Sequence, residues 1–275
     1  MSSSRKKKTS KQLKTYLAIL APILGVLLLL AVILTFGKFA ATPPEDAQTD
    51  PAPNLQEDPP ETTDFAYQII TPTDPAEEAR VGIDISEHQQ SVDWELVKAA
   101  GIDFVMIRIG YRGYTQGRLY IDSRFDQHIR GAQKAGLDVG VYFFSQAITP
   151  SEARQEARFL LMVLNWRRLD LGIAYDWEFV NSQARTAGMD GRTMTDCALA
   201  FCETIAAAGQ TPLVYFNQYQ ADNYYILDDL TQYDFWFAKY ADEMTCPYPV
   251  KMWQYTESGT VPGIAGPVDM NLYWP

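Results

Sequence analysis

The sequence predicts an α/β protein: a modified (β/α)8-like barrel with reduced helices in its C-terminal half, preceded by one transmembrane helix and a disordered stalk. Three observations support this prediction. Short apolar runs alternate with helical stretches from Arg80 onward, residues 37–79 are rich in proline and acids, and residues 16–36 carry no charge. The expected parts are therefore a basic cytoplasmic segment (1–15), a membrane span (16–36), a linker (37–79) and a folded domain (80–275).

The uncharged segment 16–36 is expected to anchor the chain in the cell membrane. As a helix it would extend about 31 Å, enough to cross a hydrocarbon core about 30 Å thick. Basic residues precede it and no acidic residue occurs before residue 39, so we expect a single-pass protein with its folded domain outside the cell. A cleaved signal peptide is the alternative, but its apolar core is usually shorter and residues 37–41 offer a poor cleavage site.

The linker and the charge distribution limit the classes of partner. Residues 41–64 contain too few large apolar residues to bury a core, so we expect an extended spacer. The small apolar patch at residues 65–70 is expected either to dock on the folded domain or to continue the spacer. After Lys38 the chain carries 16 basic and 34 acidic residues, a net charge of -18. Such a surface repels phosphate backbones, which argues against a nucleic-acid partner. With only two histidines in the chain, we expect no histidine-rich metal site.

Eight apolar runs in the folded domain are predicted to be strands, and helical stretches lie between the first six. Alternation of strands and helices implies parallel strands joined by crossover helices. Gly101, Gly136 and Gly209 stand where three helices should end, and little room for helices remains after residue 234. An open doubly wound sheet is the alternative. The predicted strands are 81–86, 104–110, 139–144, 173–178, 213–217, 234–240, 250–255 and 268–273; the predicted helices are 93–100, 123–135, 151–166, 193–208 and 218–227.

Four acidic residues lie at or near the ends of predicted strands, where barrel enzymes carry their catalytic groups. Asp176 and Glu178 lie two residues apart in an apolar strand, so they share one face with Cα atoms about 6.5–7 Å apart. Asp84 and Asp269 belong to the first and last strands. Cleavage of a glycosidic bond needs a proton donor and a second group that stabilises or attacks the sugar, and neighbouring carboxylates help to keep the donor protonated. For any single acid, a solvated loop residue is the simpler interpretation.

The folded domain resembles the glycoside hydrolase family 25 lysozymes, the Chalaropsis-type muramidases. The resemblance covers residues 80–275 and rests on motifs that occur in the expected order. The motifs are Gly82-Ile-Asp-Ile-Ser86 with His88-Gln89, Val92-Asp-Trp94, Ala99–Val105, Ile107-Arg108, Gly140–Phe143, Asp176-Trp-Glu178, Trp236–Tyr240, Trp253-Gln-Tyr255, Gly263-Ile264 and Val268–Asn271.

The resemblance implies cleavage of peptidoglycan glycan strands between N-acetylmuramic acid and N-acetylglucosamine, with retention of configuration and without a cofactor. It implies that Glu178 is the catalytic acid, that Asp176 attacks the sugar or orients its N-acetyl group, and that Asp84 and Asp269 support them. Phe143 stands where many members of the family have a histidine. The alternatives are a catalytically weak wall-binding or wall-assembly module, an adaptor between membrane and wall, and a chitinase-type hydrolase.

Several further residues are candidates for contact with substrate. Tyr142, Tyr215 and Trp253 lie near strand ends and are expected either to stack on sugar rings or to fill the core. Arg108 is expected to pair with an active-site carboxylate, because an unpaired buried guanidinium is costly. We expect the chain to be a monomer.

Overall fold

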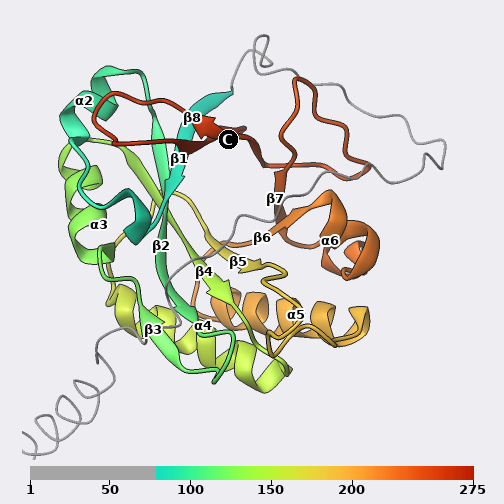
Figure 1. The fold of residues 1–275 in the computed structure, drawn as a ribbon. Helices are drawn as coiled ribbons and strands as arrows, with labels where there is room; N and C mark the ends of the chain where they lie inside the picture. The colour runs from blue at the N-terminus through green and yellow to red at the C-terminus, as the bar shows by residue number, and fades with distance from the viewer. Residues whose placement is uncertain (1–78) are drawn as a thin grey trace, which may run out of the picture. The chain divides into compact units, whose positions relative to one another are not determined.

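The computed structural model describes residues 79–275, in which eight strands close into a barrel (Figure 1). Around the barrel the strands follow the order β1-β9-β8-β7-β6-β5-β4-β2, and pairing of β1 with β2 closes the ring. The segments predicted to be cytoplasmic (1–15) and membrane-spanning (16–36), and the predicted linker up to residue 78, lie outside the described residues. The barrel strands are β1 (Arg80–Ile85), β2 (Phe104–Arg112), β4 (Asp138–Ser145), β5 (Ile173–Trp177), β6 (Pro212–Asn217), β7 (Asp234–Ala238), β8 (Met252–Gly259) and β9 (Val268–Tyr273).

The barrel confirms the eight predicted strands and excludes the open sheet, and it shows one strand orientation that was not predicted from the sequence. The last strand, β9, runs antiparallel to both of its neighbours, β8 and β1. The short connection 260–267 explains this, because a parallel crossover needs a dozen or more residues whereas an antiparallel return does not. A further short strand that was not predicted, β3 (Leu119–Ile121), pairs antiparallel with the end of β2.

The helices occupy the predicted stretches with small shifts at their ends. Thr149 caps the third predicted helix by accepting a hydrogen bond from the Glu152 backbone, and left-handed Asn165 ends it. The predicted helix 218–227 divides into an α-helix and a 3-10 turn. The helical elements are η2 (Glu87–Gln89), α2 (Trp94–Ala99), α3 (Phe125–Lys134), α4 (Pro150–Leu164), α5 (Gly191–Ala207), α6 (Gln218–Asn223) and η3 (Leu227–Leu230).

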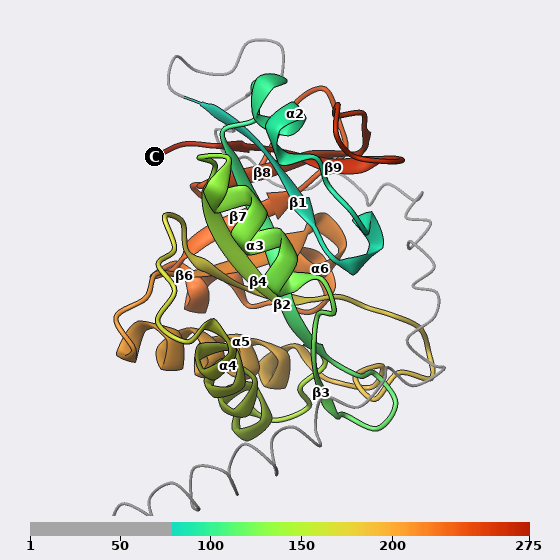
Figure 2. The ribbon, with the colours of Figure 1, turned by 90° about the vertical axis from the view of Figure 1, so that its left-hand side faces the viewer.

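Helices α3, α4 and α5 pack outside the barrel against strands β2, β4, β5 and β6, and α4 and α5 lie side by side (Figure 2). The connections between β7, β8 and β9 contain no helix in the described residues, which confirms the reduced C-terminal half. Gly101, Gly136 and Gly209 end α2, α3 and α5 in the left-handed backbone region, as predicted. Within residues 79–275, none of the helices combines the length and the apolar character that a membrane crossing requires.

Apolar side chains form two separate layers because residues alternate across each strand. The larger layer lies between the barrel wall and the helices, and the smaller one fills the barrel interior. Large interior side chains need small neighbours: a Cβ atom at Gly82 would lie only 2.4 Å from the Phe104 ring. The interior residues are Phe104, Met106, Tyr142, Ala174, Leu213, Tyr215, Trp236, Ala238 and Met252.

Candidate active site

Four carboxyl side chains lie at the same end of the barrel. Asp84 is the penultimate residue of β1, and Asp176 is the penultimate residue of β5. Glu178 directly follows the last residue of β5. Asp269 lies at the start of β9 and pairs in register with Asp84. Because β9 is antiparallel, its start meets the carboxyl ends of the parallel strands. All four residues singled out in the sequence therefore occur at this end.

The four carboxyls at this end of the barrel act on the pKa values of shared neighbours and of one another. Burial raises the pKa of the Tyr215 hydroxyl well above its ordinary value, and the charges of Glu178, Asp176 and Asp84 raise it further. Burial also raises the pKa of Asp269, and the charges of Asp84 and Glu178 act in the same direction. The barrel end is thus a single electrostatic unit.

Two buried amides fix the Asp84 carboxylate. Its Oδ2 accepts one hydrogen bond from Gln254 Nε2 and another from Asn271 Nδ2, each at 2.8 Å. Asn271 Oδ1 in turn accepts from the indole nitrogen of Trp236 at 2.8 Å, and Gln254 Oε1 accepts from the Tyr215 hydroxyl at 3.0 Å. Burial raises the pKa of Asp84, and the two amide hydrogen bonds oppose that rise. A carboxylate held in this way cannot rotate freely toward or away from its neighbours.

Asp269 and Asp84 share a proton in this arrangement. The carboxyl of Asp269 donates a hydrogen bond to Asp84, which raises the pKa of Asp269 and lowers that of Asp84. Asp84 is the better site for negative charge because the amides of Gln254 and Asn271 already donate to it. The proton therefore stays on Asp269, beside Glu178, at neutral pH.

Tyr240 is a site residue that sequence reasoning missed. Its hydroxyl donates to Gln254 Oε1 at 3.1 Å, its side chain is half-exposed, and Asp269 and Glu178 are among the groups that raise its pKa after burial. The available signal was its position at the end of the Trp236–Tyr240 motif. The two tyrosines predicted to contact sugar, Tyr142 and Tyr215, both line the barrel interior and are buried.

Trp253 lies on the other side of the barrel wall. It alternates with Gln254, whose side chain points to Asp84, so the indole packs in the outer apolar layer. Its side chain is completely buried, and its ring nitrogen donates to the Lys239 carbonyl at 2.9 Å. The expected stacking of Trp253 on a sugar ring is therefore corrected to a packing role.

The expected partner of Arg108 is also corrected. Its guanidinium donates to Asp122 Oδ2 at 2.9 Å and to Glu87 Oε1 at 3.0 Å, rather than to any of the four carboxylates. Burial would raise the pKa of Glu87, but the Ser123 hydroxyl and the charge of Arg108 outweigh that effect and lower it. Asp122 was not identified from sequence because it lies in a loop without a recognisable motif. This ion pair fastens the start of η2 to the loop before α3.

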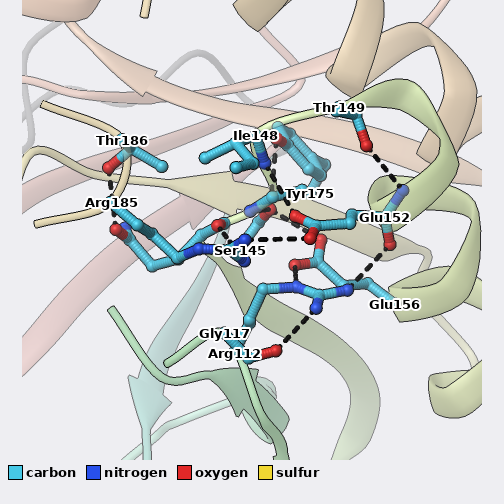
Figure 3. Close-up of polar contacts among 12 residues, drawn as sticks. Arg112, Gly117, Ser145, Ile148, Thr149, Glu152, Glu156, Tyr175, Arg185 and Thr186 are labelled. Carbon is cyan, nitrogen blue, oxygen red and sulfur yellow. Dashed lines mark hydrogen bonds and ion pairs between the residues drawn. The ribbon is translucent and has the colours of Figure 1, made fainter. Parts of the chain in front are cut away.

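A second buried polar cluster lies at the same end of the barrel, around the ends of β2 and β4 (Figure 3). Arg112 Nε donates to Glu156 Oε1 at 2.6 Å, and the Ser145 hydroxyl donates to Glu156 Oε2 at 2.6 Å. Arg112 also donates to the carbonyls of Gly117 and Glu152. Glu156 is fully buried and Arg112 nearly so. The cluster ties the β2–β3 hairpin to helix α4.

A metal ion would need several acidic, histidine or cysteine side chains grouped around one point. In residues 79–275, no group of three such side chains is arranged to hold a metal ion. The expectation that the reaction uses no cofactor remains a prediction.

The comparison with known proteins agrees with the resemblance seen in the sequence. Residues 83–264 match the family described as Glycosyl hydrolases family 25. The chain is 28% identical over 194 residues to the Autolytic lysozyme of Clostridium acetobutylicum, which covers 70% of this chain and 55% of that protein. It is 28% identical over 214 residues to Lysozyme M1 of Streptomyces globisporus, with 70% and 67% covered.

Solved structures show the same relationship. The modular autolysin LytC of Streptococcus pneumoniae has a TM-score of 0.65 and 27% identity, over 74% of this chain and 49% of LytC. The chain thus spans about half the length of the clostridial lysozyme and of LytC. The matching motifs, the barrel and the family match across residues 83–264, well over half of the chain, lead to one conclusion: this chain belongs to family 25 of the glycosyl hydrolases.

Proposed function

We propose that the protein is a muramidase that hydrolyses the β-1,4 bond between N-acetylmuramic acid and N-acetylglucosamine in peptidoglycan. Glu178 acts as the general acid, and Asp176 acts as nucleophile or stabiliser. Asp84 and Asp269 hold a proton and a negative charge beside them. The observation that carries this proposal is the group of four carboxyls at one barrel end in a member of family 25. Proteins similar to it are named lysozymes.

The assignment of roles follows from reach and environment. Glu178 lies one residue beyond β5 and is partly exposed, whereas Asp176 is buried. The longer side chain extends further toward a bound glycan, where it can protonate the leaving oxygen. Asp176 lies deeper, where a carboxylate can attack the anomeric carbon or hold the N-acetyl group that does so. The proton retained on Asp269 limits negative charge around Glu178 and so favours its protonated form.

Substitution of the acid tests the proposal. Glu178→Gln keeps the shape of the side chain but cannot donate a proton, so the rate of wall clearing should fall by about 10²–10⁴-fold. Asp176→Asn should be similarly damaging, and Asp84→Asn and Asp269→Asn milder. Glu203→Gln, which alters an exposed acid on α5, is the matched control and should retain full activity.

The outcomes of the turbidity assay separate the candidate functions. Folding of each variant is checked by circular dichroism. A folded Glu178→Gln protein that keeps more than about a tenth of the wild-type rate contradicts the acid assignment. If the wild-type protein binds wall but does not clear it, the protein is a binding or assembly module on the same scaffold.

We also propose that residues 16–36 anchor the protein in the cell membrane and that the domain 80–275 lies outside the cell. We propose in addition that the protein is a monomer. The support is the uncharged run 16–36, which basic residues precede, together with the absence of any acidic residue before residue 39. Protease treatment of intact cells should release the folded domain by cutting within the linker 37–79. Secretion of a chain with a processed N-terminus near Ala41 would contradict the anchor, and light scattering of the purified protein tests the monomer.

A further inference from the structure

The backbone that carries Glu178 lies beyond the paired part of its strand. On one side of β5 the last paired residues are Ser145 and Trp177, and on the other side they are Asp176 and Tyr215. The strand itself ends at Trp177. In the described part of the chain, the regular backbone pairing of β5 with its two neighbours therefore stops just before Glu178. Groups outside the ladder must fix the backbone at this position.

Two buried glutamine side chains bind consecutive carbonyl oxygens at this point. Gln146 Nε2 donates to the Glu178 carbonyl at 2.9 Å, and Gln220 Nε2 donates to the Trp177 carbonyl. Both glutamines are almost completely shielded from solvent. They approach from different elements, because Gln146 directly follows β4 and Gln220 belongs to α6. The peptide planes on both sides of the Glu178 Cα are thus held by amides from two directions.

The orientation of each amide is fixed by a second hydrogen bond. The Thr186 hydroxyl donates to Gln146 Oε1 at 2.8 Å, and the Asn217 backbone nitrogen donates to Gln220 Oε1 at 2.6 Å. If either amide were turned over, its oxygen would face a carbonyl oxygen, and Gln220 would also set its nitrogen against the Asn217 N–H. Each glutamine is therefore a donor to the β5 end in the only arrangement that satisfies its contacts.

Gln146 also closes the loop that Glu178 begins. Thr186 belongs to the same β5–α5 loop, and the adjacent Arg185 donates to the Gln146 carbonyl at 3.2 Å. Arg185 pairs in addition with Glu152 of α4 at 2.8 Å, within the cluster of Figure 3. The start and the middle of the loop are consequently joined through one buried side chain.

We propose that Gln146 and Gln220 are positioning residues for the acid: by clamping the carbonyls of Trp177 and Glu178 they set where the Glu178 carboxyl meets the scissile bond. This inference rests on the proposed muramidase function. Catalytic groups must be held close to the productive geometry, and a displacement of about 1 Å can lower a rate by about 10²-fold. Neither glutamine touches the substrate in this account, so both act through Glu178 alone.

The test compares Gln146→Met with wild type in kinetics on soluble, peptide-free glycan strands, with the full-length protein in mild detergent. Methionine has the length of glutamine but no donor. We expect kcat to fall by about 10–100-fold with little change in KM. Gln133→Met is the matched control, because Gln133 donates to the Arg168 carbonyl at 3.0 Å on the outside of the barrel; it should leave kcat unchanged.

A double-mutant cycle distinguishes positioning of the acid from a general structural effect. If Gln146 acts only through Glu178, adding Gln146→Met to Glu178→Gln should lower the residual rate no further. If the two losses multiply, or if Gln146→Met keeps wild-type kcat, the inference is wrong. Should Gln146→Met not fold, Thr186→Val decides, because it removes only the group that orients the amide; we expect a loss of about threefold to tenfold, and full kcat overturns the inference.

The same measurements separate the inference from the function on which it rests. An active Glu178→Gln protein, or a wild-type protein without muramidase activity, refutes the proposed function. An inactive Glu178→Gln protein beside a fully active Gln146→Met protein leaves the function intact and refutes only the positioning role.

Discussion

Because Asp84 and Asp269 share a proton, we expect substitution of Asp84 to change the stability of the protein as well as its activity. Asp84→Asn is nearly isosteric: the new amide oxygen can still accept from Gln254 and Asn271, and its nitrogen can donate to Asp269. The substitution therefore removes a charge without removing the hydrogen bonds. Asp269 then no longer faces a neighbouring carboxylate, and its pKa should fall.

The expected size follows from the two opposing effects. A charge on Asp84 about 4 Å away disfavours ionisation of Asp269 by about 4 kcal/mol at an effective dielectric constant of about 20. At pH 8 wild type avoids this repulsion only by keeping Asp269 protonated, at a similar cost in free energy, because the unfolded chain would release that proton. Hydrogen bonds from Gln254 and Asn271 to a neutral amide are each weaker than those to a carboxylate by about 1 kcal/mol. At pH 8 the Asp84→Asn protein should therefore be more stable than wild type by about 2 kcal/mol.

The direction of the pH dependence is fixed by the raised pKa of Asp269. An acid whose pKa is higher in the folded state favours the fold fully below its unfolded pKa of about 3.9, and this stabilisation is lost as pH rises toward the folded value. Between pH 5 and pH 8 the unfolding free energy of wild type should thus fall more than that of Asp84→Asn. Glu178 lies beside the pair, so wall clearing should decrease in the variant even though stability rises.

Urea unfolding followed by tryptophan fluorescence measures this effect in the full-length chain, because all six tryptophans lie in residues 79–275. The two proteins are compared at pH 5 and pH 8, and effects of other ionisable groups cancel in the difference. The reasoning is refuted if Asp84→Asn is less stable than wild type at pH 8 and shows the same dependence on pH.

Three further predictions concern the scaffold. Gly82→Ala should lower the unfolding free energy by about 1–3 kcal/mol through overpacking against Phe104, and Gly82→Ala with Phe104→Leu should recover part of this in urea unfolding; equal losses would contradict it. Arg112→Met breaks the buried pair with Glu156 and should cost about 3–5 kcal/mol, whereas a loss below about 1 kcal/mol would show that the pair is not needed. Burial lowers the pKa of His128, so wild type should lose stability as pH falls below about 6.5; His128→Phe should flatten this dependence, and an unchanged acid midpoint would argue against it.

Much of the barrel could be predicted because its signals are local. Each strand is a short apolar run, and most of the helices have an end marked by glycine or a capping residue within a few positions. The direction of β9 was less accessible, because it depends on which neighbours the strand joins. The β3 strand contains only three residues and carries no pattern of its own.

The candidate site shows the same division between local and distant information. Alternation along β5 places Asp176 and Glu178 near each other, and motif order identifies Asp84 and Asp269. The partners of Asp84 lie 170 and 187 residues away in sequence, at Gln254 and Asn271, and nothing near Asp84 indicates them.

The activity we propose is cleavage of glycan strands on the reducing side of N-acetylmuramic acid. The direct measurement is to digest purified peptidoglycan with the full-length protein, reduce the products with borohydride and identify the newly reduced sugar by mass spectrometry. The account predicts reduced N-acetylmuramic acid with wild type and almost none with Glu178→Gln. Reduced N-acetylglucosamine as the new end, or the same products from both proteins, would contradict it.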